Sequence, residues 1–157
     1  MFHNITKNIR VDPAFINYIA GSTFQYSVVF DMNGYEGIAG ILDIGTVTTA
    51  AACPFYAEGS TSPTGTFVSF YGSTAEFTVL GASGDVYLMS EVYRPQKRYV
   101  RFVAGRASAN TVIQGGIVLR YRASSLPVAE STQDSAAEAG IGGWMQDYAL
   151  CVSGTSS

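Results

Sequence analysis

Charged side chains are scarce in this sequence, and their scarcity shapes the surface that the chain can build. Charged residues make up 13% of the 157 residues, against roughly 25% in an ordinary soluble domain. Much of the surface must therefore consist of Ser, Thr, Gly and Tyr, which protect a protein poorly against association. We expect a homo-oligomer or a permanent assembly.

Histidine and cysteine are scarcer still, which removes most catalytic and metal-binding chemistry. His3 is the only histidine, and a base at the chain terminus does not suit a Ser/His/Asp or Cys/His arrangement. Cys53 and Cys151 are not spaced as a CxxC pair, and we interpret both as buried thiols. The sequence therefore predicts no catalytic residue, no metal site and no cofactor, and we do not expect an enzyme.

Long hydrophobic runs are also missing. No window approaches the roughly 20 apolar residues that a membrane helix needs, because Asp43 interrupts one run and Gly115-Gly116 interrupts another. The first residues lack the basic and then apolar pattern of a secretory signal. We therefore expect no membrane partner and no secretion.

The sequence does contain the strand-forming segments and turn signals of a β protein. Segments rich in Val, Ile, Thr, Tyr and Phe occur at residues 25–31, 35–44, 46–53, 66–71, 75–80, 85–93, 97–105 and 111–121. Asn33-Gly34 is a strong hairpin signal, and Arg94-Pro95 marks another turn. The pattern predicts an all-β, mainly antiparallel fold: a β-sandwich or jelly roll of about seven or eight strands, with at most short helical turns near the termini.

Composition divides the chain into three parts. Residues 1–23 form an N-terminal arm or a short helix, because Asp12-Pro13 is a helix-start pattern and Gly21 a stop. Residues 24–126 form the β domain. Residues 127–157 are a linker and docking tail rich in Ala, Ser, Glu and Gly that ends in an apolar patch. A closing strand on the same domain remains the other interpretation of that patch.

The basic residues are concentrated in one segment. Seven of the nine lie between residues 94 and 122, and no acid occurs between Glu91 and Glu130. The other two basic residues stand against all twelve acids, which gives the rest of the chain a net charge of −10. Such a division of charge is typical of a protein that meets a charged partner or a copy of itself.

Strand alternation predicts how this charge is displayed. In residues 97–105 it directs Val100, Phe102 and Ala104 into the core, with Arg98 at the rim of the strand. In residues 117–122 it directs Ile117, Leu119 and Tyr121 inward. If the two strands pair, their outward side chains form a single patch, which we call the expected patch: Lys97, Tyr99, Arg101, Arg120 and Arg122.

Three interpretations of these basic residues stay open. They form a solvated or edge-guarding face, bind nucleic acid with the help of Tyr93, Tyr99 and Phe102, or dock on an acidic protein surface. The stretch lacks the glycines of the RNP1 signature, and a pI near 5.0 disfavours a phosphate partner. We therefore expect a protein partner and no nucleic acid. The predicted interface comprises Arg94, Lys97, Arg98, Tyr99, Arg101, Arg120 and Arg122, with Trp144 and Tyr148 from the tail.

Two blocks of the sequence resemble a family of small tailed-bacteriophage structural proteins. The first is FDMNGYE at residues 30–36, which continues through ILDIG at residues 41–45. The second is YRPQKRYVRFV at residues 93–103, similar to the family's Lys-Arg-Tyr-Val-Arg strand. Together the blocks and their order cover residues 25–121.

The resemblance implies a virion structural protein, a decoration or cement protein on the outside of the phage head. The major capsid protein and further copies of the chain would be its partners, with a homotrimer favoured because capsids offer local three-fold positions. Its place would be the capsid surface of a virion assembled in the host cytoplasm. The alternatives are a tail-tube or head-completion protein, or a host-glycan-binding module suggested by ten Tyr, nine Phe and Trp144.

Overall fold

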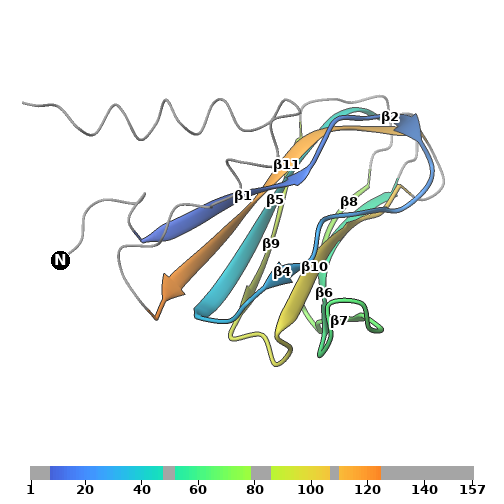
Figure 1. Ribbon diagram of the computed structural model, residues 1–157. Coiled ribbons are helices and arrows are strands. Elements are labelled where there is room, and N and C mark those ends of the chain that lie inside the picture. Colours follow the sequence, from blue (N-terminus) through green and yellow to red (C-terminus); the bar gives the residue numbers. More distant parts are fainter. Residues whose placement is uncertain (1–7, 48–51, 79–85, 107–109, 125–157) are drawn as a thin grey trace, which may run out of the picture.

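The fold is a sandwich of two antiparallel β-sheets, as the sequence predicts. The computed structural model describes residues 8–47, 52–78, 86–106 and 110–124. The five-stranded sheet contains β1 (Ile9–Phe15), β2 (Tyr18–Gly21), β5 (Tyr35–Val47), β9 (Val86–Tyr93) and β11 (Thr111–Ala123). The six-stranded sheet contains β3 (Gln25–Tyr26), β4 (Phe30–Asp31), β6 (Ala52–Ser60), β7 (Val68–Ser69), β8 (Ala75–Thr78) and β10 (Tyr99–Ala104). Figure 1 shows the two sheets facing each other, and no residue in the described ranges is helical.

The described residues form eleven strands where about seven or eight were expected, because residues 9–21 add β1 and β2 and the segment expected at 25–31 divides into β3 and β4. The five-stranded sheet has the order β1-β11-β5-β9, with β2 also on β11, and the other has β3-β10-β6-β7, with β4 on β10 and β8 on β6. The strands β3, β4 and β7 have two residues each. The first two lie within the segment expected at residues 25–31, and the third lies within that expected at 66–71.

The core lies between the sheets and is centred on aromatic rings. Phe55 stacks on Phe102 with 5.5 Å between ring centroids, and Phe15 meets Phe55 edge-on at 6.1 Å. Both Phe55 and Phe102 are fully buried, and each such side chain stabilises the fold by roughly 1.5–3 kcal/mol. The inward face of β5 adds Ile38, Leu42 and Ile44.

The helix that Asp12-Pro13 suggested is wrong, because residues 9–21 form β1 and β2. This segment is extended, as the other expectation had it, and it pairs antiparallel with β11. Asp12 does not cap a helix, and its carboxylate forms ion pairs with Arg10 and Arg120. Pro13 sits where the register of β1 shifts, a position at which a strand tolerates a missing N–H. The division of the chain into 1–23, 24–126 and 127–157 remains a prediction.

The strand expected at residues 46–53 is also displaced. β5 extends to Val47, and the next strand, β6, runs from Ala52 to Ser60. Its inward side chains Cys53, Phe55 and Ala57 alternate strictly with half-buried ones. Pro54 and Gly59 hide this pattern, because both residues are typical of turns.

Arg106 is the one basic residue of the segment that the expected interface omits, and it holds the fold together from inside. Its side chain is buried, and its Nε and Nη1 donate to the carbonyls of Thr23 and Ile19 at 2.8 Å each. Further bonds reach Thr23 Oγ1 and the carbonyl of Thr111. Arg106 therefore ties β2 and the chain just after it to β11.

Candidate protein-interaction site

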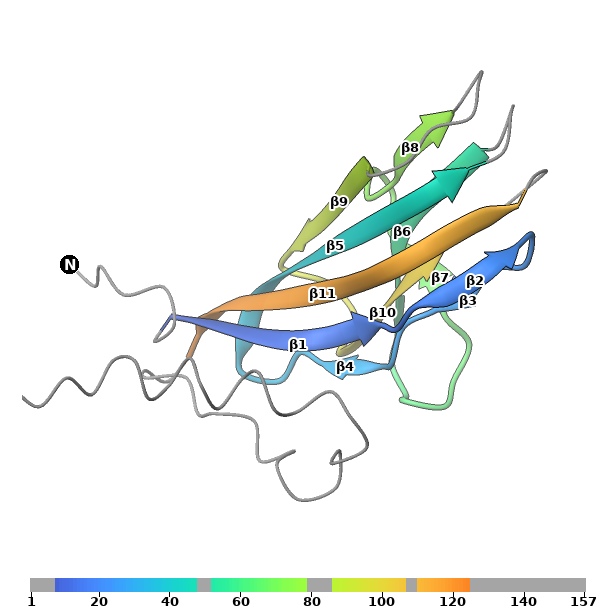
Figure 2. The ribbon, with the colours of Figure 1, turned by 90° about the horizontal axis from the view of Figure 1, so that it is seen from above.

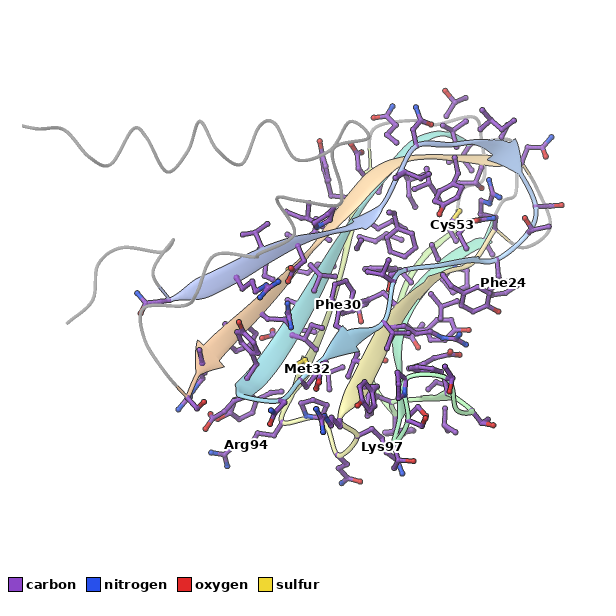
Figure 3. All side chains as sticks on the ribbon, in the orientation of Figure 1. Phe24, Phe30, Met32, Cys53, Arg94 and Lys97 are labelled. Atoms are coloured by element: carbon purple, nitrogen blue, oxygen red, sulfur yellow. The ribbon has the colours of Figure 1, made fainter. Side chains whose placement is uncertain are left out.

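Two turns and the end of β11 meet at one end of the sandwich. The turn between β4 and β5 bonds to the turn between β9 and β10 through Met32 N, which donates to Arg98 O at 2.8 Å. The start of β5 bonds to the same turn, because Arg94 N donates to Glu36 O at 2.6 Å. Ser124 N, just after β11, donates to Gly34 O at 2.8 Å. Figure 3 shows Met32, Arg94 and Lys97 at this end, and Phe24 and Cys53 at the other.

Four basic side chains project from these segments, and we call them and their acidic partners the basic end. It comprises Arg94, Lys97, Arg98 and Arg122 with the carboxylates Asp31 and Glu36. The three arginine side chains are 67%, 55% and 61% exposed. Four cations against two carboxylates leave a surplus of two positive charges, so this end attracts anionic surfaces.

Asp31 and Glu36 hold the arginines in fixed positions. Arg98 forms a bidentate pair with Asp31, with Nε 2.9 Å from Oδ1 and Nη2 2.7 Å from Oδ2. The hydrogen bond from Arg98 lowers the pKa of the Asp31 carboxyl from its usual value. Glu36 forms ion pairs with two arginines. Its Oε2 lies 3.0 Å from Arg122 Nε, and its Oε1 lies 3.8 Å from Arg94 Nη2. Lys97 has no carboxylate within ion-pair distance in the part of the chain that the structure describes.

Backbone strain marks the two arginines that share Glu36. Arg94 has a φ of 51° and Arg122 a φ of 54°, a left-handed conformation that costs an ordinary residue on the order of 1–3 kcal/mol. The ring of Tyr93 lies between them, 5.2 Å from the Arg94 guanidinium carbon and 5.5 Å from that of Arg122. The Tyr93 hydroxyl also donates to Glu36 Oε2 at 3.2 Å. Strain of this kind persists where surrounding contacts enforce a particular display of side chains.

Two shallow depressions flank the turn at this end. One, of about 600 Å³, is lined by residues that include Asn8, Tyr121 and Arg122. The other, of about 460 Å³, is lined by residues that include Met32 and the turn 94–98. Both share Gly34, Tyr35 and Glu36, so a partner that covered the turn would contact both groups of arginines.

The expected patch does not form, because β10 and β11 do not pair. β10 belongs to the six-stranded sheet and β11 to the five-stranded one. Arg101 lies on the outer face of β10, where Nε and Nη2 both donate to Glu58 Oε2 at 2.9 and 2.7 Å. The rings of Tyr26 and Phe67 each lie 4.4 Å from its guanidinium carbon. Arg101 is thus separate from the basic end and largely satisfied.

The inward and outward faces predicted for residues 117–121 of β11 are reversed, whereas Arg122 is exposed as predicted. Val118 and Arg120 point inward and are buried, whereas Ile117, Leu119 and Tyr121 are only half-buried. Arg120 is tolerated there because Nε and Nη2 donate to Asp12 Oδ2 at 3.0 and 2.7 Å. Its Nη1 donates to the carbonyl of Asp31 at 2.9 Å. Arg120 therefore forms a buried ion pair that supports the fold, and its side chain is not part of an exposed interface.

The other predicted residues are placed as follows. Arg98 is exposed beside the ring of Tyr99, with its guanidinium carbon 5.2 Å from the ring centroid, as expected for a residue at the rim of its strand. Val100, Phe102 and Ala104 are in the core, as the alternation predicts. Trp144 and Tyr148, like His3 and Cys151, lie outside the described residues.

The sequence did not single out Asp31 or Glu36 as parts of the site, and it suggested Tyr93 only as a ring that could help bind nucleic acid. Each lies far along the chain from at least one arginine that it contacts, Asp31 and Arg98 being 67 positions apart. The one available signal was that Asp31 and Glu36 flank the Asn33-Gly34 turn.

Within the described ranges, no three His, Cys, Asp or Glu side chains gather closely enough to hold a metal ion. Those ranges also contain no helix that is both long and apolar enough to cross a membrane. Cys53 is a buried free thiol, and burial raises its pKa, with Sγ 3.3 Å from Thr111 Oγ1.

Comparison with known proteins finds likeness in structure alone. No family model and no curated protein matches the sequence. One similar solved structure is a chain from the disulfide-linked pili formed by Bacillus endospore appendages, with 18% identity, a TM-score of 0.42 and coverage of 78% of this chain and 96% of that chain. Another is the PBSX exported protein XepA, with 13% identity, a TM-score of 0.48 and coverage of 85% of this chain. The match spans 43% of XepA, less than half of its length.

Proposed function

We propose that this protein is a virion structural protein, a decoration or cement protein that binds the outside of a tailed-phage head and stabilises contacts between capsid subunits. One observation carries the proposal. The two sequence blocks that resemble the phage family, residues 30–45 and 93–103, meet at the basic end through Asp31 and Arg98 and through Glu36 and Arg94. Segments far apart in the sequence thus build one exposed surface.

The chemistry of the basic end suits docking on an acidic protein surface. Its guanidinium groups are planar and pair well with carboxylates. The ion pairs with Asp31 and Glu36 hold them in place before the partner arrives, which lowers the entropy that binding costs. Such a role needs no catalytic group, and we propose that the protein is not an enzyme. The partners in this proposal are the major capsid protein and further copies of this chain.

The experiment is a thermal challenge of purified particles with and without the protein. We expect particles that carry it to release their genome at a higher temperature, because a cement protein adds contacts that heat must break. Equal release temperatures would show that the protein does not stabilise the shell. Its copy number relative to the major capsid protein separates a shell component, present on the order of hundreds of times, from a completion ring of about a dozen.

A glycan-binding module is a second candidate, favoured by the outer face of the six-stranded sheet. Tyr26 and Phe24 are 49% and 42% exposed there, and Tyr26 stacks on Arg101 beside Glu58. Exposed rings next to a fixed donor and acceptor are typical of a face that binds small polar ligands. A glycan array tests this candidate by comparing the unchanged protein with Tyr26→Ala. If neither protein retained any sugar, the glycan-binding function would be ruled out.

A further inference from the structure

The two sheets have four edges, and three of them carry the devices by which natural proteins prevent unwanted strand pairing. The edge strand β1 contains Pro13, a register shift between Pro13 and Phe15, and the Arg10–Asp12 ion pair. The six-stranded sheet ends in strands of two to four residues, namely β3, β4, β7 and β8. Short or irregular edges offer little backbone to a new strand.

The edge strand β9 has none of these devices. It is eight residues long and pairs with β5 in continuous register from Val86 to Tyr93. It contains no proline and no lysine, and Glu91 is its only charged residue. Tyr87, Met89 and Tyr93 are 70%, 62% and 48% exposed on its outer face. Figure 2 shows β9 and β1 at opposite margins of the same sheet, so the contrast lies within a single sheet.

We propose that a second copy of this chain adds its own β9 to this edge, antiparallel, to form a two-fold dimer with one continuous sheet. Two identical strands that pair antiparallel are self-complementary, because each presents the same edge to the other. The pairing gives partners to backbone N–H and C=O groups along β9 and covers apolar side chains. The proposal does not depend on the function proposed above.

Side-chain alternation and charge together select a register. Residues directly opposite each other must point to the same face, and among the registers that meet this condition we propose the one that places Tyr87 of one copy opposite Tyr93 of the other. Arg94, which follows Tyr93, then approaches the end of β9 where Tyr87 is paired with Asp43 of β5. The Oδ1 atom of Asp43 is buried and has no hydrogen-bond partner among the described residues. In this register Glu91 faces Met89 of the second copy and does not face another Glu91.

Sedimentation equilibrium of the full chain tests the proposal, with Met89→Lys as the disrupting variant and Val68→Lys as its control. Met89 and Val68 are 62% and 63% exposed, and both lie on edge strands, but Val68 is on the two-residue strand β7. A lysine on an edge strand opposes the approach of another strand. We expect the mass of Met89→Lys to be half that of the unchanged protein, and the mass of Val68→Lys to be unchanged. The monomer mass is 16.7 kDa.

A second measurement on the unchanged protein guards against a folding defect in the variant. Hydrogen exchange is followed at about 100 µM and about 1 µM, concentrations that bracket a moderate dissociation constant. We expect amides of β9 to lose protection on dilution while those of β1 keep theirs. Equal masses for the unchanged protein and Met89→Lys, or β9 protection that does not change with concentration, would overturn the proposal. The edge would then be unpaired or occupied by a strand of another protein.

Discussion

At the scale of single residues, the pair of Asp12 and Arg120 has the largest consequence for stability. Both side chains are more than nine-tenths buried, and Asp12 also receives Arg10. Removing one partner of a buried pair leaves a charge without compensation, which costs about 3–5 kcal/mol. We therefore expect Asp12→Ala to lower the free energy of unfolding by about that amount, as measured by urea denaturation.

The exposed pair of Arg98 and Asp31 provides the matched control for this prediction. It has the same 2.7 Å separation between nitrogen and oxygen, but its side chains are 55% and 42% exposed. Water screens exposed pairs, so they add little to stability. Asp31→Ala should shift the urea midpoint far less than Asp12→Ala does. Equal shifts would mean that burial of the Asp12 pair contributes nothing.

Tyr121 should make the stability of the fold depend on pH in the alkaline range. Burial first, and then the hydrogen bond from its hydroxyl to Glu91, raise the pKa of Tyr121 above its ordinary value of 10.0. The unfolded chain therefore loses this proton first as pH rises. The stabilisation is complete below about pH 10 and declines above it. We expect Tyr121→Phe to show a shallower fall of the urea midpoint above about pH 10 than the unchanged protein.

The control for Tyr121 is Tyr87→Phe, on the same outer face but 70% exposed. It should decline with pH in parallel with the unchanged protein. Parallel curves for all three proteins would show that Tyr121 does not contribute to the alkaline transition.

At the scale of elements, the packing of β5 against the core requires a residue without a side chain at position 40. A Cβ atom added at Gly40 would lie 2.8 Å from the Phe102 ring and 2.9 Å from that of Phe55. Overpacking a dense core costs about 1–3 kcal/mol, so we expect Gly40→Ala to be destabilised by that amount in urea denaturation. Gly115→Ala on the adjacent β11 is the control, because its Cβ would meet only Phe15 O at 3.8 Å. A loss at Gly115 as large as at Gly40 would contradict the packing argument.

Elements with a strong local pattern could be predicted, and those decided by distant contacts could not. Asn33-Gly34 forms the turn that its sequence predicts, with Gly34 at a φ of 86°. The strands β9, β10 and β11 lie within a few residues of their expected bounds. β1 was open to a helical interpretation because Asp12 fits an N-cap as well as an ion pair. Only a partner 108 positions away, Arg120, decides between the two.

The basic residues of the candidate site could be predicted from the sequence, but the way in which the fold groups them could not. Arg94, Lys97, Arg98 and Arg122 were expected at a surface, and the structure brings them to one end. Their grouping arises from turns that join two sheets, and not from the pairing of β10 with β11. Alternation failed at Arg120 because a paired charge can occupy an inward position that hydropathy assigns to apolar residues.

At the scale of the whole molecule, most of the positive charge of the basic segment is paired within the fold. Four separate acids, Asp12, Asp31, Glu36 and Glu58, pair with arginines of the basic segment. What is left over for a partner is the small surplus at the basic end. In the function proposed above, attachment through that end would be an interaction between exposed charges, which salt screens.

We accordingly expect binding to capsids, measured by co-sedimentation, to weaken between about 0.05 M and 0.5 M salt, as the screening length falls well below 10 Å. Lys97→Gln should weaken binding at low salt and converge with the unchanged protein at high salt. Thr46→Glu makes the same change of one unit in net charge near the opposite end of β5, where Thr46 is exposed, and should leave the salt dependence unaltered. Binding that stays equally tight across this range would mean that apolar contacts, with Trp144 and Tyr148 as candidates, dominate attachment, and the basic end would lose its assigned role.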